Sequence, residues 1–238
     1  MSAKKYKRLL IKLSGEYLGG TEGKGYDAKV VDNLTNQVGT LAEEGYEIGI
    51  VLGGGNFFRG AQGASFPMDR VAGDQIGMLA TLMNALYLKQ ALAAKGFKSR
   101  VMTGLSSPDV CEKFDKQKAI QCLKEKEIIL FGGGTGNPFF TTDTTAVLRA
   151  LEIEADIVIK GTKVDGVYDK DPMRSKSARK YDQLTFTKVL ERDLKVMDQA
   201  AIALCRENKL PLAVINIKKK TDLAQFLSGK PVGTFVTL

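Results

Sequence analysis

Three glycine-rich turns, each directly after an apolar run, are the segments of this sequence best suited to chemistry. They are Lys12-Leu13-Ser14-Gly15, Gly53-Gly54-Gly55-Asn56 and Gly132-Gly133-Gly134-Thr135-Gly136-Asn137. Glycine lets backbone N–H groups crowd around an anion and adopts positive φ at little cost. The apolar runs predict strands, so the turns fall at strand ends. Three such turns predict a site that holds several phosphates at once.

Charged side chains accompany two of these turns. Lys12 ends the first predicted strand, where its ammonium would bridge two phosphates, although a lysine there is often only a surface group. Arg59 follows the second turn and offers a bidentate fork for phosphate; the alternative is an arginine on a helix surface. Asp74 lies in the next predicted helix and either accepts hydrogen bonds from a sugar hydroxyl or is solvated.

The segment Thr135-Gly136-Asn137-Pro138-Phe139-Phe140-Thr141-Thr142-Asp143 joins a predicted strand to the start of a helix. Free N–H groups and the dipole at a helix start bind anions. The alternative is an elaborate helix cap in which Thr142 or Asp143 accepts from those N–H groups. Phe139 and Phe140 either wall a base or belong to the core.

A third polar segment follows the strand predicted at 156–160. Thr162 opens it, and Tyr168 and Asp171 would lie beside an adenine and its ribose; the alternative is a surface hairpin. The stretch 166–179, which includes Lys176, predicts an exposed loop of the length that is usually functional or mobile.

Several familiar phosphate-binding signatures are absent from the sequence. Gly23-Lys24-Gly25 is not a P-loop, because position 18 is Leu18 and position 25 is not Ser or Thr. A strand followed by G-x-G-x-x-G and the H-R-D and D-F-G motifs of protein kinases are also missing. The chain has no histidine, so its chemistry must use Lys, Arg, carboxylates and backbone N–H groups, with or without bound Mg²⁺.

The composition is that of a globular protein, with 238 residues, 44% hydrophobic and 26% charged. The net charge of +8 permits nucleic-acid binding, but the lysines are scattered and the one basic run, 218–220, lacks interleaved aromatics. No apolar run approaches the ~20 residues of a membrane span, and residues 1–6 lead straight into a strand without a signal-peptide core. Cys111, Cys122 and Cys205 form no C-x-x-C pair, which fits reduced thiols in a cytoplasm.

Short apolar runs alternate with amphipathic stretches along the chain. Strands are expected at 7–13, 46–52, 99–102, 127–131, 156–160 and 212–217, and helices at 28–44, 69–95, 115–124, 142–154, 186–193, 197–208 and 222–227. This alternation predicts an α/β fold, a three-layer α/β/α sandwich with a mainly parallel central sheet. Ligands then gather at the carboxyl ends of the strands, where all three glycine turns fall.

Together these motifs closely resemble the bacterial-type uridylate (UMP) kinases of the amino-acid-kinase superfamily, collinearly over nearly the whole chain. The run 134–143 is the most specific match, whereas the glycine triplet is shared across the superfamily. The other matching segments are 12–16, 53–56, 58–60, 78–81, 152–156, 162–166 and 195–198.

The resemblance implies an activity and a setting. The expected reaction is transfer of the γ-phosphate of ATP to UMP, giving UDP and ADP, with Mg²⁺, in cytoplasmic pyrimidine nucleotide biosynthesis. The expected protein is a homohexamer of single-domain chains (1–238), with an acceptor lobe at about 1–155 and an ATP lobe at about 156–238. GTP activation and UTP inhibition occur in such kinases, and the response of this chain stays open at this point.

The resemblance also assigns residues. The ATP site would comprise Lys12, Leu13, Ser14, Gly15, Gly55, Arg59, Thr162, Tyr168 and Asp171. The UMP site would comprise Gly54, Asp74, Thr135, Gly136, Asn137, Pro138, Phe139, Phe140, Thr141 and Thr142. The catalytic residues would be Lys12, Arg59 and Asp198, with Asp198 orienting Lys12 or organising the metal shell. The resemblance assigns no direct metal ligand. The GTP-responsive region would be Gly20, Thr21, Glu22, Gly23, Lys24 and Gly25.

Two other functions stay open on the sequence alone. A kinase of the same fold would act on a carboxylate or carbamate, which the Phe139-Phe140 segment disfavours. A non-catalytic, basic nucleic-acid-binding regulator would instead bind oligonucleotides with a steep dependence on salt.

Overall fold

The computed structural model describes residues 5–60, 66–175 and 177–238. Its helices are α1 (Gly15–Leu18), α2 (Ala28–Glu43), α3 (Arg70–Ala93), α4 (Lys116–Lys124), α5 (Thr142–Glu152), α6 (Phe186–Glu191), α7 (Gln199–Glu207) and α8 (Asp222–Leu227). Its strands are β1 (Arg8–Leu13), β2 (Glu47–Leu52), β3 (Ser99–Thr103), β4 (Glu112–Lys113), β5 (Ile128–Gly132), β6 (Ile157–Thr162), β7 (Val167–Tyr168), β8 (Lys180–Tyr181), β9 (Gln183–Thr185), β10 (Leu212–Asn216) and β11 (Thr234–Thr237).

Nine strands form one sheet in the order β4-β3-β5-β2-β1-β6-β10-β11-β9. Every neighbouring pair in it is parallel except β10 and β11. Strands β1, β2, β5 and β6 are apolar along most of their length because they are covered on both faces. This confirms the predicted mainly parallel sheet.

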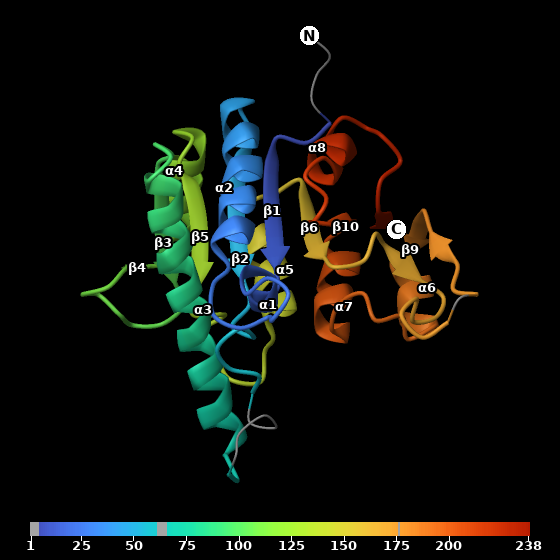
Figure 1. The fold of residues 1–238 in the computed structure, drawn as a ribbon, viewed down its shortest axis with the longest axis horizontal. Coiled ribbons are helices and arrows are strands. Elements are labelled where there is room, and N and C mark those ends of the chain that lie inside the picture. The colour runs from blue at the N-terminus through green and yellow to red at the C-terminus, as the bar shows by residue number, and fades with distance from the viewer. Residues whose placement is uncertain (1–4, 61–65, 176) are drawn as a thin grey trace.

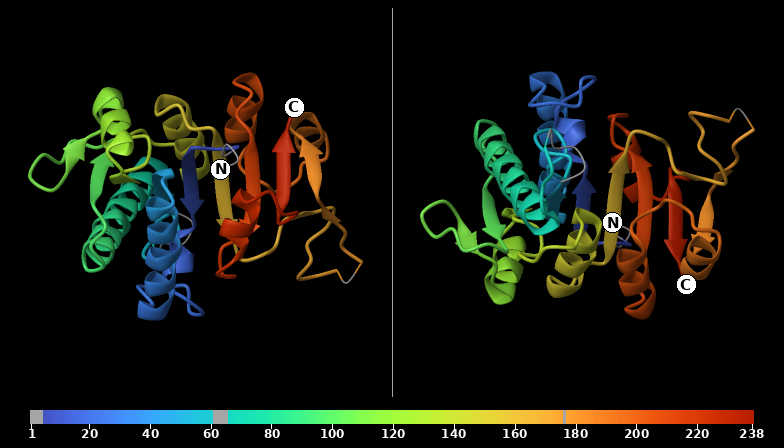
Figure 2. Two further views of the ribbon diagram at one scale, coloured as in Figure 1. Left: turned by 90° about the horizontal axis from the view of Figure 1, so that it is seen from above. Right: turned by 90° about the horizontal axis from the view of Figure 1, so that it is seen from below.

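Helices cover both faces of the sheet (Figures 1 and 2). One core joins the sheet to α1, α2, α3 and α8, and the other joins it to α4, α5, α6 and α7. Leu9 and Ile11 belong to the first core and Leu10 to the second, as strand alternation requires. The predicted three-layer α/β/α architecture is therefore confirmed.

Local sequence signals set the helix ends. Asp27, Asp69 and Asp115 are N-cap residues whose carboxylates accept from backbone N–H groups of the first turn. Gly45 and Gly96 adopt φ of 89° and 82° two and three residues after the last residues of α2 and α3, where glycine commonly ends a helix. Within the described part of the chain, no helix is long and apolar enough to cross a membrane.

Short elements depart from the expectations. Strands β4, β9 and β11 and helix α1 were not predicted, because two to four residues carry too little periodicity. The stretch 166–179 is not wholly irregular: β7 pairs with β8 in an antiparallel hairpin, and Val167 is buried. Lys176 and residues 1–4 lie outside the described residues. All three cysteines are free thiols.

Candidate active site

The three glycine turns lie side by side at one edge of the sheet. They follow β1, β2 and β5, which are consecutive in the strand order and run parallel. Register fixes their alignment, since Leu13 pairs with Leu52 and Val51 pairs with Phe131. The sequence prediction that these turns share one edge is confirmed.

Glycine is needed in the turns for two different reasons. A Cβ on Gly15 would lie 2.5 Å from the carbonyl oxygen of Gly53 and 2.8 Å from the amide nitrogen of Gly55, so the first two turns need glycine for close approach. Gly133, Gly134 and Gly136 adopt φ of 73°, 59° and 84°. Positive φ is therefore confined to the third turn, while Gly15 and the triplet 53–55 stay outside the left-handed region.

Helix α3 holds the second and third turns in place. The Asn84 amide donates to the carbonyl oxygen of Gly53 at 2.7 Å and to the Asn56 side chain at 2.8 Å, and Asn56 donates to the Gly25 carbonyl at 2.9 Å. The Thr81 hydroxyl accepts from the Gly133 N–H at 2.8 Å. These buried side chains leave the turns little freedom to move.

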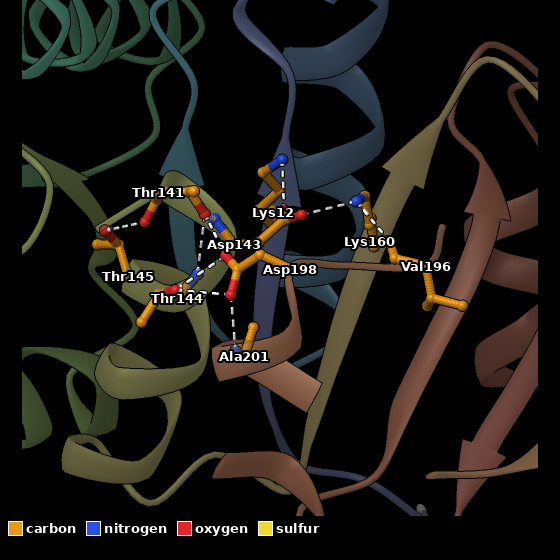
Figure 3. A network of polar contacts seen from close by, with 9 residues as sticks. All are labelled: Lys12, Thr141, Asp143, Thr144, Thr145, Lys160, Val196, Asp198 and Ala201. Atoms are coloured by element: carbon orange, nitrogen blue, oxygen red, sulfur yellow. Dashed lines mark hydrogen bonds and ion pairs between the residues drawn. The ribbon is translucent and has the colours of Figure 1, made fainter. Parts of the chain in front are cut away.

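Two lysines and one carboxylate form a cluster at the centre of this edge (Figure 3). Lys12 on β1 and Lys160 on β6 are direct register partners. Asp143, in the first turn of α5, lies between them: its Oδ1 is 2.6 Å from Lys12 Nζ, and its Oδ2 accepts from Lys160 Nζ at 2.8 Å. Lys160 Nζ also donates to the Val196 carbonyl at 2.6 Å. Strand register and a helix start thus place two ammonium groups around one carboxylate.

Burial and charge act in opposite directions on this cluster. Burial raises the pKa of Asp143, but the attraction of Lys12 and Lys160 outweighs it and the pKa is lowered overall. Burial lowers the pKa of Lys160, and Asp143 only partly offsets that effect. Each ionised form depends on its neighbours, so the cluster works as a unit.

Asp198 ties α5 to α7. It is the N-cap of α7 and accepts from the Ala201 N–H at 2.9 Å, from the Thr144 hydroxyl at 2.8 Å and from the Thr141 hydroxyl. The carboxylate in contact with Lys12 is that of Asp143. A catalytic or metal-organising role for Asp198 stays a prediction.

Thr141 is the N-cap of helix α5. Its hydroxyl accepts from the N–H groups of Asp143 and Thr144, so the suggestion that Thr142 or Asp143 caps this helix is wrong by one or two residues. Phe139 and Phe140 are 65% and 53% exposed, so the alternative that they are core residues is also wrong. The Thr135 hydroxyl accepts from the Asn137 N–H at 3.1 Å and shapes the turn before them.

Asp74 reaches this loop from α3. Its Oδ2 accepts from the Phe139 N–H at 2.7 Å and pairs with Arg70 Nε at 2.7 Å. Phe139 adopts φ of 71°, a strained value for a residue with a side chain, and the Arg70 guanidinium lies 5.5 Å from its ring. Asp74 is thus not merely solvated, because it fixes the segment predicted to bind UMP.

The other residues assigned to UMP follow the same edge. Gly54 lies against α3, where a Cβ would come within 2.8 Å of Ala80 Cβ. Gly136 lies against Gly104, where a Cβ would come within 2.5 Å of the carbonyl oxygen. Asn137 and Pro138 lie in the loop that leads into α5, and Thr142 is the first residue of that helix.

The residues assigned to adenosine surround a separate cavity of about 420 Å³. Thr162, Tyr168 and Asp171 all line it, together with Lys160. The Tyr168 hydroxyl donates to Asp165 at 2.6 Å, and this bond, with burial, raises the pKa of Tyr168. Because Lys160 also belongs to the central cluster, the cavity opens beside the lysines. The alternative that this segment is a surface hairpin is correct in that β7 and β8 form a hairpin, but this hairpin also forms one wall of the cavity.

The remaining ATP-site residues lie in or directly after the first two glycine turns. Leu13 is buried at the end of β1, and Ser14 is the N-cap of α1. Arg59 lies in a loop, not on a helix, and its Nη2 is 3.4 Å from Glu16 Oε1. The loop 20–25 adjoins the same place, because the Gly25 N–H donates to the Asn56 carbonyl at 3.2 Å.

The strongest omissions from the sequence-based site are Asp143 and Lys160. The sequence identifies Lys160 only as the last residue of a predicted strand, and Asp143 only as a candidate helix cap. The usable signal was that Lys12 and Lys160 both end apolar runs in the same way. Asn84, Thr81 and Thr144 were also missed, because a polar residue within a helix gives no local sign of what it supports.

The amino acid kinase family profile matches residues 7–216. The chain belongs to the amino acid kinase family. The uridylate kinase of Pseudomonas syringae is 50% identical over 232 residues, which cover 98% of this chain and 94% of that protein. The uridylate kinase of Salmonella typhimurium is 48% identical over 232 residues, covering 98% and 96%. Within its family, this kinase therefore groups with the uridylate kinases.

Solved structures agree with the sequence comparison. The crystal structure of UMP kinase from Bacillus anthracis matches this kinase with a TM-score of 0.94 at 38% identity, covering 98% of this chain and 96% of that one. UMP kinase from Ureaplasma parvum gives a TM-score of 0.92 at 35% identity, covering 98% and 100%. The kinase fold is therefore shared over almost the whole chain.

Proposed function

We propose that this kinase transfers the γ-phosphate of ATP to UMP and produces UDP and ADP. The observation that carries the proposal is the Lys12–Asp143–Lys160 cluster, which lies between the loop 135–142 and the cavity lined by Tyr168. An acceptor bound in the loop and ATP bound in the cavity would direct their phosphates at the two lysines.

The chemistry needs charge neutralisation more than proton transfer. The second pKa of a phosphate monoester is about 6, so the attacking oxygen of UMP is already ionised at pH 7. It forms a bond to the γ-phosphorus while the bond from that phosphorus to the β–γ bridging oxygen breaks, and ADP leaves. Two unit charges ~4 Å apart repel by roughly 4 kcal/mol at an effective dielectric constant near 20. Lys12, Lys160 and the glycine N–H groups oppose that repulsion.

Magnesium fits this site as a companion of ATP. Among the described residues, no group of three Asp, Glu, Cys or His side chains could hold a metal by itself. Mg²⁺ in kinases is held by one or two carboxylates together with substrate phosphates. Asp143 and Asp198, whose charges both act on Lys160, would provide those carboxylates. When bound, Mg²⁺ neutralises phosphate charge.

The sheet order supports two lobes within one domain. Strands β1 to β5 come from residues before 155 and occupy one side of the sheet, whereas β6, β10, β11 and β9 occupy the other. We assign UMP to the first side (about 1–155) and ATP to the second (about 156–238). The lysine cluster lies where β1 meets β6.

A panel of acceptors tests the proposed function. ADP formation from ATP and Mg²⁺ is measured with UMP, CMP, aspartate, glutamate and carbamate. UMP is expected to give the highest kcat/KM by a wide margin. Turnover with aspartate, glutamate or carbamate in place of UMP would support the alternative kinase, and inactivity with every acceptor would overturn the proposal. Repeating the panel with GTP and with UTP tests the proposed activation and inhibition, which we place at loop 20–25.

Asp74→Asn is expected to raise the KM for UMP about tenfold and to change kcat less. The neutral amide accepts more weakly from the Phe139 N–H and no longer pairs with Arg70, so the strained loop loses its anchor. Steady-state kinetics with varied UMP checks this. Asp109→Asn, which removes an exposed carboxylate between β3 and β4, is the control. An unaltered KM for UMP in Asp74→Asn would rule out the assigned role.

We also propose a homo-oligomer, six copies by resemblance, that forms in the cytoplasm. Helix α3 projects beyond the sheet (Figure 1) and carries an apolar stripe of Ile76, Leu79, Met83 and Tyr87, each 39% to 52% exposed. A second copy of the chain would cover it. Leu79→Glu is expected to lower the sedimentation coefficient to that of a smaller species. Gln117→Glu, which adds the same charge at an exposed site on α4, should leave it unchanged. Unaltered sedimentation of Leu79→Glu would exclude this face.

A further inference from the structure

Glu16 lies among cations at the mouth of the proposed ATP site. It is the second residue of α1, directly after the first glycine turn. Its Oε1 lies 3.4 Å from Arg59 Nη2, and its Oε2 lies 3.4 Å from Lys163 Nζ. Arg59 follows the second glycine turn, and Lys163 follows β6. One carboxylate therefore bridges loops from the two sides of the sheet.

The aliphatic part of the Glu16 side chain also lies close to the glycine loops that contain Gly23 and Gly55. A Cβ on Gly55 would be 3.4 Å from Glu16 Cγ, and a Cβ on Gly23 would be 3.7 Å from Glu16 Cβ. The carboxylate is thus held close to the turns whose N–H groups are expected to bind phosphate. A fixed negative charge at such a place would repel the substrate unless the carboxylate gives way.

The two ion pairs have the properties of contacts that exchange easily. Both are longer than the 2.7–2.9 Å typical of a charge-assisted hydrogen bond, and the three side chains are 33% to 61% exposed. Exposed pairs of this kind contribute little to stability. A triphosphate brings more charge and more acceptor oxygens than one carboxylate, so it would displace Glu16 from Arg59 and Lys163.

We propose that the Glu16 carboxylate is a placeholder for a nucleotide phosphate. In the empty enzyme it neutralises Arg59 and Lys163, which would otherwise repel each other and the Lys12–Lys160 pair. The phosphates of ATP displace it on binding, and its return to the two cations favours release of ADP. This inference rests on the proposed function, since it takes the Arg59 and Lys163 side as the place of the ATP phosphates.

The direction in which phosphate affinity changes when Glu16 loses its charge tests this proposal. Glu16→Gln keeps the shape but removes the competing charge, so the Kd of ADP and of inorganic tripolyphosphate is expected to fall about three- to tenfold. The KM for ATP should fall with it, without a rise in kcat. If Glu16 only supported the local structure, the variant would bind both ligands more weakly, because α1 and Arg59 would be held less firmly. Isothermal titration calorimetry at low salt measures both ligands.

Matched variants complete the experiment. Glu43→Gln removes the same charge at the exposed end of α2 and should leave both Kd values within about twofold. Lys163→Gln should bind tripolyphosphate more weakly than the wild type, and adding Glu16→Gln to it should raise the affinity by less than in the wild type. If Glu16→Gln does not fold, the weaker binding of tripolyphosphate by Lys163→Gln alone is the test. Unchanged or weaker ADP binding by folded Glu16→Gln, or unchanged tripolyphosphate binding by Lys163→Gln, overturns the placeholder. Failure of the wild-type kinase to bind ADP would instead overturn the proposed function.

Discussion

Lys12→Ala is expected to lower kcat by about 10²- to 10³-fold while the Kd of UMP stays within about twofold. Lys12 acts on the phosphoryl group in transit, where charge changes most, and its Nζ is held 2.6 Å from Asp143 Oδ1. Among the described residues, no hydrogen bond or ion pair joins Lys12 to the loop 135–142, so we expect this loop to keep its shape in the variant. Single-turnover kinetics, together with UMP titration by calorimetry, separates the two quantities.

Two results would count against this role of Lys12. Unchanged UDP production would exclude the lysine from the transition state, and a proportional loss of UMP affinity would make it a binding residue instead. Lys29→Ala, an exposed lysine in the first turn of α2, is the control for removal of one positive charge and should leave kcat unchanged.

Asp143→Asn should have the second large effect, on activity and stability together. The variant leaves Lys12 and Lys160 as neighbouring, mostly buried cations without their shared carboxylate. Breaking a buried pair in this way costs roughly 3 kcal/mol of unfolding free energy. We expect kcat to fall by at least about 10²-fold as well, because both ammonium groups lose their positions. Urea unfolding and steady-state kinetics measure the two effects.

The same variant predicts a change in the pH dependence of stability. The pKa of Asp143 is lowered in the folded state, so its carboxylate contributes stability above the unfolded value of about 3.8 and loses it as pH falls through the lower, folded pKa. Asp143→Asn cannot titrate and should lose less stability than the wild type as pH falls below about 3.8. Identical acid profiles would contradict the assigned pairing.

A double variant separates charge from shape. In Lys12→Ala/Asp143→Asn the excess positive charge is removed, so part of the lost unfolding free energy should return while activity does not. If the double variant is no more stable than Asp143→Asn alone, repulsion between the lysines is not the cause of its instability.

The sequence predicted the sheet well because its central strands are buried on both faces. The runs at β1, β2, β5 and β6 are continuous and apolar, and their alternation with helices leaves few topologies. The placement of the three glycine turns at one edge followed directly. Strand β11 was not predicted because it has only four residues, two of which are the polar Thr234 and Thr237.

The centre of the site could not be predicted in the same way. Lys12 and Lys160 are far apart along the chain, and their contact depends on β6 lying beside β1. Asp143 sits in the first turn of α5, a position where carboxylates commonly stabilise a helix, so its bond to Lys160 had no local sign. Non-local pairing decided which of several ordinary residues form the cluster.

A crystal structure of the kinase with ADP, UMP and a fluoroaluminate mimic of the transferring phosphoryl group would test the central claim most directly. We expect the mimic to lie within about 3.2 Å of both Lys12 Nζ and Lys160 Nζ, with the N–H groups of Gly15 and the 53–55 turn directed at phosphate oxygens. A mimic bound away from both lysines, with those N–H groups turned from every phosphorus atom, would contradict it.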